Sequence, residues 1–450
     1  MIITQEYDVL IIGAGTSGAH LAKAVASKGW SVLVIEKLPR EKTGTKYDIF
    51  HIEEREFARL GIPRPQKGEP GWAFEFEKNY NADPRTLYPK LQTNPIVGLH
   101  MHEYTLLLCD LAEKAGAEIM FETAFEAFTS DSYGKISGVT AVKNGETLSI
   151  KAKIVVDCSG IGAAARTSLP DTCVIDNKPL GDDDMFYVIL RYVKIKNAKD
   201  YLDGSTFWAY YKSWIAPCAD PEGAIIGIGA CHSYEYAEKI YEEMEKTVPL
   251  PEYELVKIEK GRTPFTKSPY SLVTDNFIVS GDAGCLTKSV NGEGVTSSIY
   301  MLNIAADCID RAFKIGDTSK ETLWKINTEY NRTQGAEFAF LRALLTGVVN
   351  AADFNEFEYV FKENIINDEL LNALNGSAVP AKVLIKAVAN FVKGIVTKNI
   401  RLSTVKAAAD AFKNAVDISS HYKKFPDSPE DFNEWRKTAD NIYSKIGKIQ

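Results

Sequence analysis

The sequence predicts an α/β protein with three parts. A parallel-sheet domain begins at the N-terminus, an antiparallel sheet is inserted into that domain, and the C-terminal region is helical. The first observation is that residues 8–35 have the pattern of strand, helix and strand. The second is the alternation of aromatic and other residues in 70–94 and 183–232, which is typical of strands. The third is that the chain has helical patterns from residue 331 onward.

The composition indicates an acidic globular protein. At 450 residues the chain is long for one hydrophobic core, so two or three packed subdomains are expected. The net charge of -8 argues against a general nucleic-acid binder. No apolar run is long enough for a membrane span, and the N-terminus lacks the pattern of a signal peptide. The seven cysteines are scattered without a C-x-x-C pair, which favours reduced thiols. We therefore expect a cytoplasmic protein.

The first predicted element is a βαβ unit. Residues 8–12 (DVLII) and 31–35 (SVLVI) are apolar runs typical of buried strands. Residues 17–28 between them have helical spacing. The glycine-rich turn that joins the first strand to the helix follows the G-x-G-x-x-G pattern of dinucleotide-binding (Rossmann-like) domains.

Each glycine of this turn has an expected role. Gly13 permits the tight turn, Gly15 lets a pyrophosphate approach the backbone, and Gly18 lets helix and strand pack closely. The helix N-terminus then offers free N–H groups to phosphates. Glu36 ends the second strand, where a carboxylate accepts hydrogen bonds from ribose hydroxyls and repels a 2′-phosphate. The motif therefore predicts FAD or NAD rather than NADP.

Two more glycine motifs follow predicted strands. Residues 155–166 (VVDCSGIGAAAR) contain Asp157, Gly160 and Arg166. Residues 277–299 contain Gly281, Asp282, Asn291, Gly292, Glu293 and Gly294. Taken singly, each motif could be only a strand-to-helix turn.

Together, the three motifs resemble those of the p-hydroxybenzoate-hydroxylase-like FAD superfamily. The resemblance implies FAD as cofactor, with Asp157, Gly160 and Arg166 in its binding segment and Asp282 at the ribityl chain. It also implies that the helix entered through residues 291–294 directs its N-terminus at the flavin pyrimidine. A helix dipole there would stabilise the anionic reduced flavin.

Within that superfamily the chain most resembles the geranylgeranyl reductases over nearly its whole length. Residues 210–229 carry an aromatic-x-Trp-x-x-Pro segment at Trp214 and Pro217, followed by a glycine-rich strand. Residues 421–443 resemble the tail of the archaeal members. The resemblance implies an FAD-dependent oxidoreductase that reduces a carbon–carbon double bond of an apolar, isoprenoid lipid-like substrate by hydride transfer.

The sequence departs from the family pattern at two places, and the first departure leaves the substrate and the proton donor open. Where archaeal prenyl reductases have a P-C-G-D-like segment, this chain has residues 45–63, with Asp48 at the cysteine's place. Asp48 could be a general acid if burial raised its pKa, or the N-cap of a helix. His51, one helical turn on, is an equal candidate. The second departure is Ser289, which stands where a proline is usual.

Two further histidines and one tryptophan are candidates at the site. His100 and His102 are expected to share one face of a strand end, near where relatives use an arginine at the flavin. Contacts to flavin or substrate and a plain hydrogen-bonded pair are both open, and no metal site is predicted because further ligands are not found. Trp214 is the aromatic residue singled out at the substrate cavity.

The motifs divide the chain into three predicted domains. The FAD-binding domain is discontinuous and the sheet domain would bind substrate; the divisions are 1–60, 95–175 and 260–330 for FAD, 61–94 and 176–259 for the sheet domain, and 331–450 for the helical domain.

Partners and alternative functions remain open at this point. The basic, amphipathic residues 381–416 could rest on an anionic membrane surface or form a helix pair that closes the cavity. No second dinucleotide motif is visible, so a ferredoxin, another reductase or NAD(P)H could donate electrons. A hydroxylase or halogenase is the alternative enzyme, although only Trp214 and Pro217 match the halogenase W-x-W-x-I-P motif. A flavin-binding protein without turnover is the third possibility.

Overall fold

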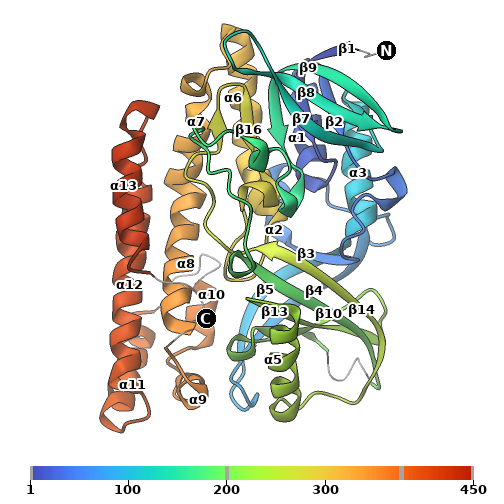
Figure 1. Ribbon diagram of the computed structural model, residues 1–450. Helices are drawn as coiled ribbons and strands as arrows, with labels where there is room; N and C mark the ends of the chain where they lie inside the picture. Colours follow the sequence, from blue (N-terminus) through green and yellow to red (C-terminus); the bar gives the residue numbers. More distant parts are fainter. Residues whose placement is uncertain (1–3, 198–201, 350, 374–379, 447–450) are drawn as a thin grey trace.

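A computed structural model describes residues 4–197, 202–349, 351–373 and 380–446, and it confirms the α/β class. Two eight-stranded sheets lie one above the other in the view of Figure 1, and helices border both. The first sheet has the order β15-β16-β9-β1-β2-β6, with β7 and β8 attached beside β9. Its strands are β1 (Thr4–Ile12), β2 (Val32–Ile35), β6 (Glu118–Met120), β7 (Thr123–Ser130), β8 (Ile136–Lys143), β9 (Glu146–Asp157), β15 (Val273–Thr274) and β16 (Phe277–Val279).

The first sheet is parallel at its centre because its apolar runs are buried on both faces. Strand β1 pairs in parallel with β2 and β9, and β9 pairs in parallel with β16. Every residue of β2 is buried, as a parallel sheet covered by helices requires. The covering helices are α1 (Thr16–Ala26), α3 (Met101–Lys114), α6 (Val295–Ile315) and α7 (Lys320–Tyr330). The predicted βαβ unit therefore forms as the sequence indicated.

The second sheet is antiparallel apart from one parallel pair, β11 with β4. Its order is β14-β10-β13-β12-β11-β4-β5-β3. These strands are β3 (Ile49–Glu53), β4 (Trp72–Ala82), β5 (Lys90–His100), β10 (Met185–Ile195), β11 (Gly204–Trp208), β12 (Ser213–Pro217), β13 (Gly223–Ala230) and β14 (Tyr253–Pro264). The two aromatic segments that predicted strands both lie in this sheet.

The two faces of the second sheet are covered differently. Helix α5 (Tyr234–Thr247) packs on one face and buries Ala237, Tyr241 and Met244 in a core cluster. The other face carries a separate apolar cluster, several members of which are only partly buried. We call this second group the sheet-face cluster; it consists of Ile49, Ala73, Phe74, Leu190, Tyr192 and Ile225, with Tyr47, Phe76, Val188, Trp214 and Cys218 packed against them.

Residues 49–53 differ from the sequence prediction. They form strand β3, which pairs with β5, and the helix α2 (Glu54–Leu60) begins only after it. Asp48 is therefore the residue before a strand, and the alternative that it caps a helix is wrong. The register with β5 decides the conformation, because Ile49 pairs with His100 and Ile52 pairs with Val97.

The C-terminal region is helical, as predicted. It comprises a π-helical turn (Asn331–Gly335), α8 (Ala336–Val349), α9 (Phe354–Lys362), α10 (Asp368–Ala373), α11 (Ala381–Val396), α12 (Leu402–Tyr422) and α13 (Phe432–Tyr443). Helices α11, α12 and α13 run along one side of the molecule in Figure 1, away from the first sheet. Among the described residues no helix combines the length and apolar character needed to cross a bilayer.

Candidate active site

The glycine turn after β1 is fixed by close backbone contacts. A Cβ on Gly13 would lie 2.4 Å from the Cys158 carbonyl oxygen, and Gly13 has a φ of +104°. A Cβ on Gly18 would lie 1.9 Å from the Gly13 carbonyl oxygen. Gly15, by contrast, has nothing within 4 Å of a Cβ, although it caps the N-terminus of α1. The open space at Gly15 leaves the helix N-terminus accessible to an anionic group.

Glu36 ties the glycine turn to the end of β2. Its carboxylate accepts hydrogen bonds from the backbone N–H groups of Ala14 and Leu38, each at 2.9 Å. Each oxygen accepts one of these bonds, so acceptor capacity remains for further donors. The side chain thus lies where ribose hydroxyls could reach it.

Asp157 and Arg166 lie inside the protein. The Asp157 carboxylate accepts hydrogen bonds from the backbone N–H groups of Ser159 and Arg166, at 2.9 and 2.7 Å. Burial raises the pKa of Asp157, and those hydrogen bonds oppose the rise. The Arg166 guanidinium donates through Nε to the Ala283 carbonyl at 2.7 Å. It also donates to the carbonyls of Asp176 and Lys178. Arg166 therefore positions the third glycine motif through its backbone.

The third glycine motif lies against the first helix. Gly281 has a φ of +64°, and a Cβ there would lie 3.2 Å from Ser17 Oγ on α1. The Asp282 carboxylate follows directly, and Lys46 Nζ is 3.8 Å from its Oδ2. Burial raises the pKa of Asp282, whereas the Lys46 ammonium opposes the rise. In the second motif, Gly160 also has a positive φ, of +77°.

The N-terminus of α6 already interacts with a carboxylate. Glu293 Oε1 accepts hydrogen bonds from the backbone N–H groups of Thr296 and Ser297, at 2.8 and 3.2 Å. Gly294 is the N-cap residue, and Gly292 has a φ of +71°. Asn291 Oδ1 accepts from the Glu293 backbone N–H at 3.3 Å. The helix dipole expected at the flavin is thus partly offset by Glu293.

Three consecutive residues connect the third glycine motif with the second sheet. Lys46 lies near Asp282 and donates to the Arg262 carbonyl at 2.6 Å. Tyr47 belongs to the sheet-face cluster, and a Cβ on Gly261 would lie 2.1 Å from its hydroxyl oxygen. Asp48 follows, before β3. The segment Lys46–Asp48 therefore brings the sheet-face cluster next to the cofactor-binding motifs.

Asp48 is at the centre of a charged network. Its Oδ1 is 2.9 Å from His100 Nδ1, and its Oδ2 accepts from Lys257 Nζ at 2.9 Å. Lys257 also donates to Glu259, whose other oxygen accepts from the Tyr192 hydroxyl at 3.0 Å. Burial alone would raise the pKa of Asp48, but the hydrogen bonds from Lys257 and His100 outweigh it, so the pKa is lowered. Asp48 therefore lacks the raised pKa that the sequence analysis required for a general acid.

His51 is in an apolar setting on β3. Its ring makes edge contacts with Phe74 and Phe76, at centroid distances of 5.6 and 5.7 Å. Nε2 is closed off from solvent and has no hydrogen-bond partner among the described residues. Burial lowers the pKa of His51 to about 4. A neutral imidazole at physiological pH is a poor proton source.

His100 and His102 do not act as a pair on one strand face. His100 ends β5 and contacts Asp48, whereas His102 lies within α3, with its Nδ1 2.6 Å from the Thr43 carbonyl oxygen. The expectation that they share one face of a strand end is wrong because α3 starts at Met101. No group of three potential metal ligands is found in the part of the chain that the structure describes.

Trp214 lies on β12, and its indole ring covers Gly227 of the neighbouring strand β13. The two residues are paired in the sheet, and a Cβ on Gly227 would lie 2.2 Å from the indole ring. The absent side chain at Gly227 thus makes room for the indole. Trp214 packs against the sheet-face cluster, and it is only partly buried. It is therefore available to line a cavity over this face.

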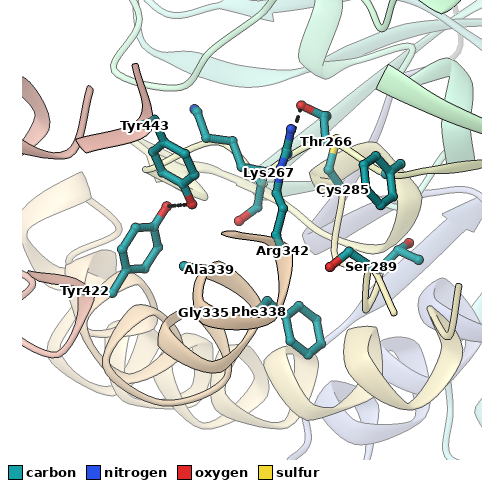
Figure 2. A pocket seen from close by; sticks show the side chains of 13 residues that line it. Thr266, Lys267, Cys285, Ser289, Gly335, Phe338, Ala339, Arg342, Tyr422 and Tyr443 are labelled. Carbon is teal, nitrogen blue, oxygen red and sulfur yellow. Dashed lines mark hydrogen bonds between the residues drawn. The ribbon is translucent and has the colours of Figure 1, made fainter. Parts of the chain in front are cut away.

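A pocket lies where the C-terminal helices meet the third glycine motif (Figure 2). Arg342 Nη1 donates to Thr266 Oγ1 at 3.3 Å, and Tyr443 donates to the Tyr422 hydroxyl at 3.3 Å. Ser289 Oγ is buried without a hydrogen-bond partner among the described residues. Burial lowers the pKa of Lys267, also in the lining, to about 8.

The sequence analysis missed Lys46, Lys257 and Glu259. Lys257 and Glu259 are two residues apart on β14, so both side chains lie on one face of the sheet. The alternation of opposite charges along a strand could have identified Lys257 and Glu259 as candidates. Their contact with Asp48 could not be predicted, because more than two hundred residues separate them from it in sequence.

Comparisons with known proteins agree on a flavoprotein. The FAD binding domain family matches residues 6–212. The digeranylgeranylglycerophospholipid reductase of Sulfolobus acidocaldarius is 28% identical over 98% of this chain and 98% of its own length. The reductase of the same name from Methanocella arvoryzae is 25% identical over 74% of this chain and 84% of its own. The chain is therefore similar to digeranylgeranylglycerophospholipid reductases over nearly its whole length. It is an FAD-dependent oxidoreductase.

Solved structures agree with this fold. A geranylgeranyl bacteriochlorophyll reductase-like protein from Thermoplasma acidophilum superposes with a TM-score of 0.68, at 18% identity, over 88% of this chain and 99% of that protein. A flavin-dependent brominase superposes with a TM-score of 0.64, at 18% identity, over 88% of this chain and its own full length. Identities this low show the fold alone.

The residues of this flavoprotein fit its cofactor, FAD. The open N-terminus of α1 at Gly15 suits a pyrophosphate, and Glu36 has acceptor capacity for ribose hydroxyls. Asp282 follows the turn that packs on α1. All seven cysteines are free, and burial raises the pKa of Cys285 beside this turn to about 12, so it is protonated.

Proposed function

We propose that this protein reduces a carbon–carbon double bond of an apolar, isoprenoid-type substrate bound on the sheet-face cluster. The observation that carries the proposal is the segment Lys46–Asp48, which joins Asp282 of the cofactor-binding motifs to the exposed side of that cluster. The names of the curated relatives, digeranylgeranylglycerophospholipid reductases, support an isoprenoid substrate. We also propose that the second sheet is the substrate-binding part.

The sheet-face cluster has the character of a lipid-binding surface. Phe74, Leu190 and Ile225 form its floor, and Trp214 and Phe76 are partly exposed beside them. These side chains offer mainly apolar and aromatic contacts; the indole N–H of Trp214 is a donor, and the Tyr192 hydroxyl of the cluster donates to Glu259. Such a surface would hold a prenyl chain and exclude water from the reacting bond.

When bound, reduced FAD supplies a hydride from N5. The protein must then provide a proton for the second carbon of the double bond. We propose that the pair of His100 and Lys257, both held by the ionised Asp48 carboxylate, delivers this proton at the edge of the sheet-face cluster. The side chains of Asp48 and Lys257 are 36% and 44% exposed, so protons can be replaced from solvent. Asp48 thus acts by positioning.

The test uses the purified flavoprotein, reduced without oxygen and mixed with substrate in a stopped-flow spectrometer. Rapid flavin reoxidation by geranylgeraniol or a geranylgeranylated glycerophospholipid, with a saturated product by mass spectrometry, is the expected result. Reoxidation by oxygen alone should be slow and show a single phase. An additional absorbing phase with oxygen, together with a hydroxylated or halogenated product, would assign the protein to the monooxygenases or halogenases. Flavin that cannot be reduced would indicate a binding protein without turnover.

A further inference from the structure

Helices α11 and α12 leave large apolar side chains in solvent. On α11, Leu384, Val388, Val392 and Val396 recur every four residues. We define the α11–α12 stripe by its exposed members: Leu384, Ile385, Val388, Val392, Val396, Leu402, Phe412 and Val416, whose exposed fractions range from 40% to 75%. Single exposed apolar residues are common on protein surfaces, but a continuous row is not.

The opposite faces of both helices are already packed. A Cβ on Gly394 would lie 2.6 Å from the Tyr359 ring on α9, and the Tyr359 hydroxyl donates to the Asn390 carbonyl. On the second helix, a Cβ on Gly347 of α8 would lie 2.1 Å from Ala411 Cβ. The helices are therefore fixed by their inner faces, and the stripe is their outer surface.

The charge around the part of the stripe from Leu384 to Leu402 is one-sided, whereas Asp410 and Asp417 lie farther along α12, beside Phe412 and Val416. Between Glu369 and Asp410 the sequence has no acidic residue, although the whole chain carries a net charge of -8. The same stretch contains six basic residues: Lys382, Lys386, Lys393, Lys398, Arg401 and Lys406. Lys393 is paired with Glu363, and Arg401 is paired with Glu356. In the described part of the chain, the other four ammonium groups have no carboxylate oxygen within 4.0 Å.

The lysines also lie where an interfacial helix needs them. At 100° per residue, Lys382, Lys386 and Lys393 follow one border of the stripe, between its apolar side chains and the packed face. Long lysine side chains at such a border can keep their ammonium groups in the headgroup layer while the apolar row enters the acyl boundary.

We propose that α11 and the first turn of α12 bind to an anionic phospholipid surface, with the part of the α11–α12 stripe from Leu384 to Leu402 inserted at the headgroup boundary. A second copy of this chain fits less well. A two-fold interface would place the same patch on both partners and bring the lysine borders together. An anionic lipid layer instead satisfies both the apolar row and the unpaired lysines.

The test is binding of the full-length flavoprotein to sedimented vesicles of phosphatidylcholine, alone or mixed with phosphatidylglycerol. We expect binding to the mixed vesicles, weakened by salt, and little binding to phosphatidylcholine alone. Ile385→Asp should lower vesicle partitioning at least about tenfold, because it places a charge in the centre of the stripe. The double variant Lys382→Gln/Lys386→Gln should lower vesicle partitioning roughly 25-fold, because each lysine contributes about fivefold.

Ile315→Asp is the matched control. Ile315 is 61% exposed at the end of α6, comparable with 69% for Ile385, and it lies outside the stripe. This variant should bind vesicles like the unmodified protein. Equal binding by Ile385→Asp and Ile315→Asp would overturn the proposal, as would equal binding to neutral and anionic vesicles. Absence of vesicle binding with a dimer that Ile385→Asp dissociates would assign the stripe to contact between copies. None of these readouts requires turnover, so they are independent of the proposed reaction.

Discussion

Replacing His51 with phenylalanine tests the apolar setting of this residue on β3. The His51 pKa of about 4 lies below the value of about 6.5 in unfolded chains. The unfolded state therefore takes up a proton as pH falls through about 6.5, while the folded state does not until near pH 4. Stability is therefore lost as pH falls across this window. From these two values the loss at about pH 5 is roughly 2 kcal/mol, an upper value because part of the ring touches solvent.

The variant should remove this acid-side loss. Phenylalanine keeps an aromatic ring between Phe74 and Phe76 and eliminates the unpartnered Nε2. At about pH 7.5 we expect His51→Phe to be as stable as the unmodified protein or slightly more stable. At about pH 5 the free energy of unfolding of the variant should exceed that of the unmodified protein by up to roughly 2 kcal/mol beyond any difference at about pH 7.5. The assay is urea unfolding followed by tryptophan fluorescence at both pH values.

His232 provides the matched control. Its side chain is 42% exposed and contacts Asp183, so His232→Phe changes an imidazole in contact with water. That variant still contains His51, so it should keep the loss of stability on acidification that we assign to His51. If His51→Phe lost as much stability on acidification as the unmodified protein, the imidazole would titrate normally and the reasoning from burial would fail. Loss of product formation in His51→Phe with intact flavin reduction and substrate binding would show that His51 is the proton donor after all.

Three further predictions concern the cofactor motifs and the charged network. Gly18→Ala should lose FAD and about 1–3 kcal/mol of stability, because the added Cβ clashes with the backbone. Gly15→Ala should keep the stability of the apoprotein but weaken FAD binding at least about tenfold. Flavin titration and urea unfolding measure both effects. Arg166→Lys should lower flavin content because a lysine cannot reach all three carbonyls, and a flavin content equal to the unmodified protein's would contradict its positioning role. Lys257→Met should raise the pKa of Asp48. Because this pKa is lowered in the folded protein, ionised Asp48 stabilises the fold above about pH 4, and this stabilisation is lost as the pH falls further. Asp48→Asn should therefore show no such loss of stability at acid pH in unfolding experiments.

Local pattern was sufficient for the βαβ unit. The apolar runs, the helix spacing and the glycines at positions 13, 15 and 18 all lie within thirty residues, and each has a short-range physical meaning. The structure gives Gly13 a positive φ and leaves no space for a Cβ on Gly18. Glu36 was placed near the same turn because its strand follows directly.

Local pattern failed where distant strands decide the conformation. The sequence IFHIE has an apolar spacing that suits a strand or the start of a helix, and the acidic residues after it favoured the helix. Pairing with β5, about fifty residues away, makes it a strand. The state of Asp48 was likewise set by Lys257, which no local rule could bring near it. Burial alone predicted a raised pKa, and the ion pair reversed it.

The segment Lys46–Asp48 links the third glycine motif to the sheet-face cluster. The three side chains of this segment each contact a different partner. Tyr47 is held by the close approach of Gly261, and Asp48 is held by two cations. Lys46 is held less firmly, because its Nζ is 3.8 Å from Asp282 Oδ2 and donates a hydrogen bond to only the Arg262 carbonyl. Of the three contacts, the one next to the cofactor is therefore the easiest to change. A group that binds Asp282 could therefore displace the Lys46 ammonium while Tyr47 and Asp48 keep their own contacts.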